Sequence, residues 1–166
     1  MPTRVYNVLF VSDDNTARSI LAEAILNKLG ENKFKAYSAG SRPASEINPY
    51  AMELLEINNL SKDHLQSKNW NEFSQSDSVE FDFVFTLSES AAKETSPKWR
   101  GQPITANWFI ESPTEETGHN IDKKRAFNDA YKKLQRRISF FASLPFEKLN
   151  ALSLKHEVEV IGSSQA

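Results

Sequence analysis

Residues 8–25 read VLFVSDDNTARSILAEAI and place three structural signals in succession. Residues 8–11 are four consecutive apolar residues, a pattern typical of a strand buried in a sheet. The largely polar residues 12–19 indicate a short loop. Apolar residues at helical spacing follow, and Gly30 is placed to end the helix that they predict. The sequence therefore predicts a strand, a tight loop and a helix N-terminus.

This junction, which we call the anion loop (residues 12–19), predicts a site for an oxyanion. Backbone N–H groups are free at a helix N-terminus, and the helix dipole adds positive potential there. Arg18 contributes a fixed charge and a planar fork of donors that suits a tetrahedral anion. Ser12 ends the strand where a nucleophile would stand. Asp13 and Asp14 are acidic and are expected to repel an anion.

The composition predicts one soluble domain over residues 1–166. The formal net charge of −2 argues against nucleic-acid binding, which requires a basic face. No run approaches the roughly 18 apolar residues of a membrane span, and the N-terminus lacks the apolar core of a signal peptide. We therefore expect no membrane contact and a cytoplasmic location.

The chain contains no cysteine, which excludes disulfides, thiolate metal sites and a cysteine nucleophile. His64, His119 and His156 lie far apart in polar contexts, so each is expected to be an ordinary surface residue. Neither a metal nor a cofactor is predicted. One alternative stays open, in which the acidic residues 13–15 hold Mg²⁺.

Predicted strands and helices alternate along most of the chain. The expected strands are residues 8–11, 33–38, 81–87 and 103–108. The expected helices are residues 20–29, 51–58, 67–73 (capped by Ser67 or Asn69), 91–94 and 122–143, with a short one within 144–161. This alternation predicts a single α/β domain with three layers, α/β/α, around a four-stranded parallel sheet. Residues 12–19, 88–97 and 109–118 follow strands and are expected to converge at one edge.

The longest predicted helix begins at a cap formed by Asn120 or Asp122 and runs to about Ser143. Apolar residues at three- and four-residue spacing mark its buried stripe: Phe127, Ala130, Tyr131, Leu134, Ile138 and Phe141. Its basic residues are expected on a solvated face rather than in a nucleic-acid patch: Lys132, Lys133, Arg136 and Arg137. Residues 162–166 are expected to form a disordered tail.

The anion loop carries Ser12, Asn15, Ala17, Arg18 and Ser19, and further motifs follow it in order. These are YSAG (37–40), NP (48–49), QSKNWNEF (66–73), SP (96–97) with Trp99, GQP (101–103), NW (107–108) and LPFEKL (144–149). On these motifs the chain resembles the low-molecular-weight protein-tyrosine phosphatases, and most closely their arsenate-reductase branch. The resemblance spans about residues 5–161, and the last motif is similar to a tail of bacterial members.

The resemblance implies a mechanism in which a cysteine thiolate at the strand end attacks the phosphorus or arsenic of a bound oxyanion. Loop N–H groups and the arginine stabilise the developing charge, and an aspartate on a later loop protonates the leaving group. Arsenate reductases then use further thiols to release arsenite. The oxyanion-binding residues that it implies are Ser12, Asp13, Asp14, Asn15, Thr16, Ala17, Arg18 and Ser19. The implied ligands are phosphate, sulfate, an arsenate-like oxyanion or a phosphorylated compound.

The positions that carry this chemistry in the family differ here. Ser12 stands at the position of the nucleophilic cysteine, and Ser112 stands at that of the general acid. Ser88 and Ser96 stand at the positions of the reductase branch's auxiliary cysteines. A serine hydroxyl is far less acidic than a thiol, whose pKa is near ~8.5, and it needs an adjacent general base. No histidine lies in the loop to serve as that base. Loss of a general acid alone typically costs ~10²- to 10⁴-fold in rate.

The sequence thus favours a catalytically inactive relative that keeps an oxyanion pocket and has an oxyanion, a phosphorylated ligand or a protein as its partner. Two alternatives stay open. In one, the chain is an active phosphatase or arsenate reductase, with its cysteines engineered to serine or with Ser12 or water as the nucleophile. In the other, Asp13 or Asp14 pairs with Arg18 and closes the loop of a protein-interaction module.

Two details of the loop are also predicted. Ser19 is expected to form a hydrogen bond with Ser12 or with the loop backbone. Asn15 is expected to be structural, because asparagine tolerates the left-handed backbone that such loops need.

Overall fold

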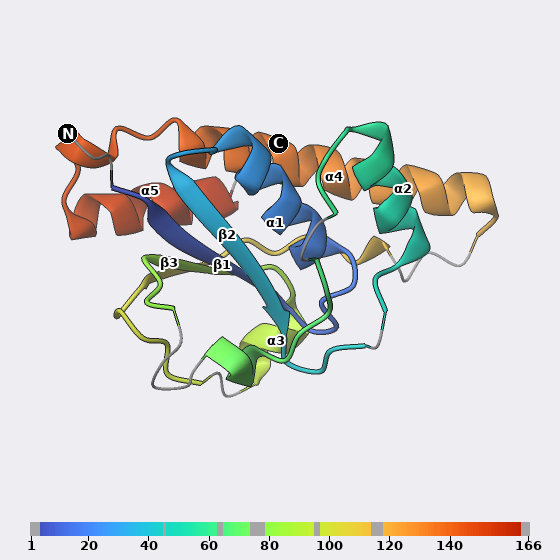
Figure 1. Cartoon of the computed structure of the whole chain (residues 1–166), viewed down its shortest axis with the longest axis horizontal. Coiled ribbons are helices and arrows are strands. Elements are labelled where there is room, and N and C mark those ends of the chain that lie inside the picture. The colour runs from blue at the N-terminus through green and yellow to red at the C-terminus, as the bar shows by residue number, and fades with distance from the viewer. Residues whose placement is uncertain are drawn as a thin grey trace.

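A four-stranded parallel sheet lies at the centre of the computed structural model, which describes residues 4–44, 46–62, 65–73, 79–94, 97–113 and 118–163. Its strands are β1 (Tyr6–Ser12), β2 (Phe34–Gly40), β3 (Phe83–Thr86) and β4 (Ile104–Asn107), in the spatial order β2-β1-β3-β4 (Figure 1). β1 pairs with both β2 and β3, so its carboxyl end lies where the strand order reverses. Ligands of such sheets bind at this point.

The helices in these ranges cover both faces of the sheet. They are α1 (Arg18–Leu29), α2 (Pro49–Ile57), α3 (Glu89–Lys93), α4 (Asn120–Ala142) and α5 (Ala151–Ser163), with 3₁₀ helices η1 (Trp70–Phe73) and η3 (Phe146–Lys148). α1, α4 and α5 pack on one face, and the short α3 and η1 cover the other (Figure 1). The predicted three-layer fold is confirmed.

Alternation of side chains along β1 separates two apolar cores. Val8 and Phe10 belong to the larger core under α1, α2, α4 and α5. Leu9 and Val11 belong to the smaller core under α3 and η1. β1 is therefore buried on both faces, which fixes the position of the loop that follows it. No helix within the described ranges is both long enough and apolar enough to cross a membrane.

The buried stripe predicted along α4 is confirmed, since all six of its apolar residues are buried. Lys132, Lys133 and Arg136 are exposed, as expected. Arg137 is the exception, because it is 7% exposed and its Nη1 donates to the Phe109 carbonyl oxygen at 3.1 Å. The prediction that it lies on the solvated face was wrong: its long apolar stem packs inward, and its guanidinium reaches a carbonyl in the loop after β4.

The predictions for the start of α4 and for the end of α5 were wrong. The N-cap of α4 is His119 rather than Asn120 or Asp122, and its N–H donates to the Asp122 carboxylate at 3.2 Å. Asp122 therefore supports the helix from inside its first turn. Gly162 and Ser163 belong to α5, where a disordered tail was expected, because α5 packs against β4. Residues 164–166 of that predicted tail lie outside the described residues.

Candidate functional site

The anion loop folds around Ser12, whose side chain is fully buried. Its hydroxyl lies 2.7 Å from the Ser19 hydroxyl and accepts the N–H of Asn15 at 3.1 Å. Asn15 Nδ2 donates to Ser19 Oγ at 2.7 Å. The predicted contact between Ser12 and Ser19 is confirmed. The three side chains form a closed network away from solvent, in which each hydrogen bond supports the next.

Asn15 holds the shape of the loop. Its φ is 53°, in the left-handed region that asparagine tolerates, which confirms the structural role predicted for it. Its Oδ1 accepts the N–H of Lys68 at 2.8 Å, so residues 65–69 are attached to the loop. On the other side, a Cβ at Gly40 would lie 2.8 Å from the Asp13 carbonyl oxygen. Only glycine lets the end of β2 approach the loop this closely.

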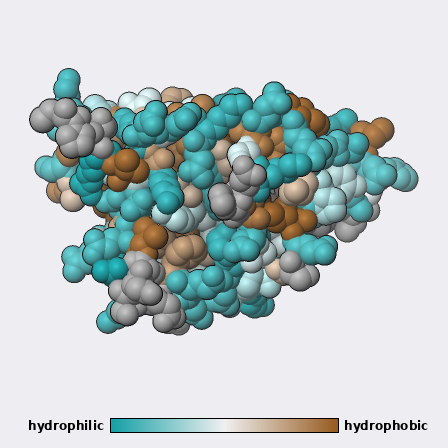
Figure 2. Space-filling model, viewed as in Figure 1, coloured by the Kyte–Doolittle hydropathy of each residue, from teal (hydrophilic) through white to brown (hydrophobic). Residues whose placement is uncertain are grey.

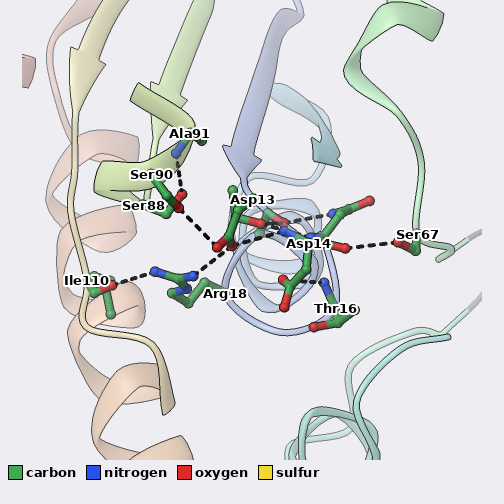
Figure 3. Close-up of polar contacts among 12 residues, drawn as sticks. Asp13, Asp14, Thr16, Arg18, Ser67, Ser88, Ser90, Ala91 and Ile110 are labelled. Atoms are coloured by element: carbon green, nitrogen blue, oxygen red, sulfur yellow. Dashed lines mark hydrogen bonds and ion pairs between the residues drawn. The ribbon is translucent and has the colours of Figure 1, made fainter. Parts of the chain in front are cut away.

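Arg18 points back into the loop from the first turn of α1 and is 6% exposed. Its Nη1 donates to the Ile110 carbonyl oxygen at 2.8 Å, and its Nη2 donates to Asp13 Oδ1 at 3.0 Å (Figure 3). Asp13 Oδ2 accepts the Ser90 hydroxyl at 3.0 Å. One alternative left open by the sequence was that Asp13 or Asp14 pairs with Arg18, and Asp13 is the one that does. Its carboxylate lies between the guanidinium and Ser90.

Three backbone amides of the loop donate to oxygens of the loop's own side chains. The Asp14 N–H donates to Asp13 Oδ1 at 2.9 Å, and the Thr16 N–H donates to Asp14 Oδ1 at 3.3 Å. The Asn15 N–H donates to Ser12, as described above. Amides at this kind of helix N-terminus are the donors that a bound anion would use. The two carboxylates therefore repel an anion and also engage donors that it would need.

The loops after β1, β3 and β4 converge, as the parallel topology predicted. Ser90 comes from α3 after β3, and Ile110 comes from the loop after β4. Neither residue was predicted as part of the site. For Ser90 the only sequence signal is a hydroxyl residue close behind a predicted strand. A backbone carbonyl such as that of Ile110 gives no sequence signal at all.

Ser88 and Ser112, which the resemblance places at an auxiliary-cysteine position and at the general-acid position, lie in different surroundings. Ser88 is buried and its hydroxyl accepts the Ala91 N–H at 3.2 Å, so it caps α3 (Figure 3). Ser112 lines a cavity of about 530 Å³ beside α4, two residues beyond the carbonyl that contacts Arg18. Ser96 lies outside the described residues.

Ser67 or Asn69 was predicted to cap the helix over residues 67–73, and Ser67 does not cap it. The Ser67 hydroxyl donates to the Asp14 carbonyl oxygen at 3.1 Å. The reason is that residues 65–69 run along the edge of the sheet, where Gly40 forms a parallel bridge with Asn69. Asn69, the other predicted cap, accepts the N–H of Asn71 at 2.8 Å at the start of η1.

A buried ion pair lies behind the loop and joins residues 65–69 to α1. Glu23 accepts the Ser38 hydroxyl at 2.6 Å, and Lys68 Nζ lies 3.9 Å from the same carboxylate oxygen. Burial raises the pKa of Glu23, although Ser38 and Lys68 partly offset this effect. Burial also lowers the pKa of Lys68, against the attraction of Glu23 and Glu72. Each charge therefore depends on its partner for much of its stabilisation.

Removing one charge of this pair is expected to destabilise the fold strongly. Lys68→Met leaves the Glu23 carboxylate buried without its cation, a kind of change that typically costs ~3–5 kcal/mol. The double variant Glu23→Gln/Lys68→Met removes both charges and keeps an acceptor for Ser38, so it is expected to recover most of that loss. Urea denaturation of the wild type, both single variants and the double variant measures the free energies of unfolding. If Lys68→Met and the double variant lose the same free energy of unfolding, the proposed stabilisation of Glu23 by Lys68 is contradicted.

The pH dependence of stability tests the direction of the Glu23 shift. Because its pKa is higher in the folded chain than in the unfolded one, the unfolded chain loses its proton first as the pH rises. Stability therefore falls through the window between the two pKa values. Lys68→Met removes an influence that lowers the pKa of Glu23, so the melting temperature of this variant is expected to fall more steeply than that of the wild type as the pH rises above the ordinary pKa of a glutamate. Glu23→Gln has no carboxyl group at this position and is expected to lack this part of the pH dependence. A steeper fall of the melting temperature in Glu23→Gln than in the wild type would contradict the raised pKa of Glu23.

Metal ligands do not gather at the loop. Within the described ranges, no three His, Asp or Glu side chains come together in a way that could hold a metal ion. Asp13 is paired with Arg18, and Asp14 accepts a backbone N–H. His119 and His156 are exposed, while His64 lies outside the described residues. The Mg²⁺ alternative therefore finds no support in this geometry.

Known proteins are similar to this chain in fold and in sequence. Residues 7–149 match the family described as low molecular weight phosphotyrosine protein phosphatase. An arsenate reductase of Oceanobacillus iheyensis is 27% identical over 140 residues, which are 81% of this chain and 94% of the relative. The crystal structure of an arsenate reductase from Archaeoglobus fulgidus has a TM-score of 0.59 and 25% identity, covering 80% of this chain and 98% of the other.

A structure of Wzb from Vibrio vulnificus in complex with benzylphosphonate shares the fold, with a TM-score of 0.63. The two chains are 23% identical, and the match covers 87% of this chain and 99% of the Wzb chain. The family resemblance inferred from the anion loop and its companion motifs is thus confirmed. The chain belongs to the low molecular weight phosphotyrosine protein phosphatase family.

Proposed function

We propose that this chain is a catalytically inactive member of its family that keeps the frame of an oxyanion site and fills it with the Asp13 carboxylate. The ion pair of 3.0 Å between Arg18 and Asp13 carries the proposal. In this arrangement the charge that would hold an oxyanion is neutralised by the chain itself. Phosphate, sulfate or arsenate must displace the carboxylate before it can bind.

The contacts of Ser12 support the loss of catalysis. Its hydroxyl interacts with the Ser19 hydroxyl and the Asn15 N–H, and neither group is a base that can take its proton. A serine nucleophile requires such a base within hydrogen-bond reach. Ser112, at the general-acid position, cannot supply a proton at neutral pH. By this argument the chain has neither the nucleophile nor the general acid that the family's reaction uses.

The ligand class that suits the loop is a tetrahedral oxyanion or a phosphorylated compound, held weakly. The family match and the benzylphosphonate complex of Vibrio vulnificus Wzb support this class by analogy. Arg18 and the loop amides are the groups that would hold the ligand here. Because the carboxylates of Asp13 and Asp14 engage these donors, binding is expected to be much weaker than in a loop without them.

An active arsenate reductase with cysteines engineered to serine explains less of the site. Engineering of the cysteines accounts for Ser12, Ser88 and Ser96. It does not account for the Asp13 carboxylate paired with Arg18, or for a serine at position 112. A natural change of function accounts for all of these positions together.

The wild-type chain tests the proposal directly. Isothermal calorimetry with phosphate and with arsenate is expected to give a dissociation constant weaker than about 1 mM. Assays of p-nitrophenyl phosphate hydrolysis and of thiol-dependent arsenate reduction are expected to show no rate above the buffer. Turnover that increases with protein concentration would overturn the inactive assignment. Phosphate binding at about 10 µM or tighter would overturn the filled loop.

A further inference from the structure

A groove between α2 and α4 lies apart from the anion loop and shares no residue with it. Its volume is about 560 Å³. Leu54, Phe127 and Tyr131 line it, and the ring of Tyr50 stacks on that of Phe127 with centroids 5.2 Å apart. These side chains give the groove an apolar floor made by both helices.

The rims of the groove expose two large apolar side chains. Ile57 at the end of α2 is 65% exposed, and Ile121 in the first turn of α4 is 72% exposed. Figure 2 shows hydrophobic side chains at the surface around α2 and the first turns of α4, among hydrophilic ones. Apolar side chains gathered around an apolar groove are typical of a surface that binds a partner.

The charged side chains of the groove are mostly basic. Lys124, Arg125 and Lys132 of α4 line it together with a single acidic residue, Glu53, for a net charge of +2. Glu53 pairs with Lys124 at 3.5 Å. In the described part of the chain neither Arg125 nor Lys132 has an ion pair, and both are exposed. This basic rim stands on a chain whose formal net charge is −2, so an acidic partner is attracted to this face in particular.

We propose that the groove docks an amphipathic, acidic α-helix of a partner protein. The α4 side of the groove runs from Ile121 to Gln135, a rise of roughly 21 Å, which matches a helix of about 14 residues. A helix of that length places apolar residues at i, i+3, i+4 and i+7 on the floor. Its acidic residues then lie along the edge of the apolar face, within reach of Arg125 and Lys132.

A labelled peptide tests this proposal by fluorescence anisotropy. The probe is a fluorescein-labelled 14-residue helix with leucine at i, i+3, i+4 and i+7 and glutamate at the flanking positions. Saturable binding to the wild-type chain is expected, with a dissociation constant in the micromolar range, about 1–100 µM. The same peptide with lysine in place of glutamate is expected to bind at least about tenfold more weakly.

Two groove variants and one matched control complete the test. Ile57→Asp/Ile121→Asp and Arg125→Glu/Lys132→Glu alter exposed side chains, and each is expected to keep the wild-type melting temperature and to weaken binding about tenfold or more. Leu152→Asp changes a side chain that is 79% exposed on α5, outside the groove, and is expected to bind as the wild type does.

Four results would overturn the proposal. One is the absence of saturable binding by the acidic peptide, and another is equal binding of the acidic and basic peptides. The third is a loss of binding in Leu152→Asp equal to that in the groove variants. The fourth is self-association of the wild-type chain in sedimentation velocity that Ile57→Asp/Ile121→Asp abolishes, because the occupant would then be a second copy.

Discussion

The double variant Ser12→Cys/Asp13→Asn is expected to hydrolyse p-nitrophenyl phosphate at least ~10²-fold faster than the buffer background, above which the wild-type chain is expected to show no rate. A cysteine at position 12 would meet the Ser19 hydroxyl and the Asn15 N–H, two donors that stabilise a thiolate. Asparagine at position 13 keeps the size of the side chain and leaves the charge of Arg18 free for the substrate. Initial rates of p-nitrophenol release between about pH 5 and pH 8 measure the gain.

Ser112→Asp, added to the double variant Ser12→Cys/Asp13→Asn, places a carboxylic acid at the position that the resemblance assigns to the general acid. It is expected to add a factor of about 10², the low end of what a positioned acid contributes. Its effect is expected to disappear as the pH rises past the pKa of the new carboxyl group. An unchanged pH profile would show that this side chain does not reach the leaving group.

Two controls decide whether the gain comes from the proposed site. Arg18→Met in the same background is expected to abolish it, because the oxyanion loses its fixed charge. Ser12→Cys alone is expected to gain far less, since the Asp13 carboxylate both occupies the guanidinium and raises the pKa of a neighbouring thiol. If Ser12→Cys/Asp13→Asn folds and binds phosphate but does not hydrolyse the substrate, the frame of the loop has lost its catalytic geometry.

Asp13→Asn alone is expected to tighten phosphate binding by about 10- to 100-fold, equivalent to ~1.4–2.8 kcal/mol. The substitution removes a negative charge that lies 3.0 Å from Arg18 and frees that guanidinium. The contact between Arg18 and the Ile110 carbonyl oxygen keeps the arginine in place. Calorimetric titration of wild type and variant with inorganic phosphate, at the same ionic strength, measures the change.

Asp14→Asn is the matched control for this experiment. Asp14 carries the same charge one residue away, but its Oδ1 accepts the Thr16 N–H, and within the described residues it forms no ion pair with Arg18. Its replacement is therefore expected to tighten binding by less than about tenfold. Equal gains in the two variants would mean that general repulsion, and not the filling of the site by Asp13, limits binding.

The order of the strands and helices could be predicted from local sequence patterns. The apolar run before Ser12, the Gly30 helix end and the buried stripe of α4 all came out as the spacing predicted, because strand and helix periodicity depends on neighbours within one or two turns. The convergence of three loops also followed, since it depends only on parallel strands sharing a direction. Ser67 and Arg137 were misplaced because their partners, Asp14 and Phe109, are distant in sequence.

The sequence by itself determined which groups are absent. Without cysteine the chain has no thiolate to offer, whatever its fold, and position 112 carries a serine and not a carboxyl group. Only the tertiary structure decided which aspartate of the anion loop pairs with Arg18. Asp13 rather than Asp14 meets Arg18 because Ser90 and the Ile110 carbonyl oxygen fix the two side chains from 77 and 92 residues away. Such contacts depend on which loops the sheet brings together, and no local pattern encodes them.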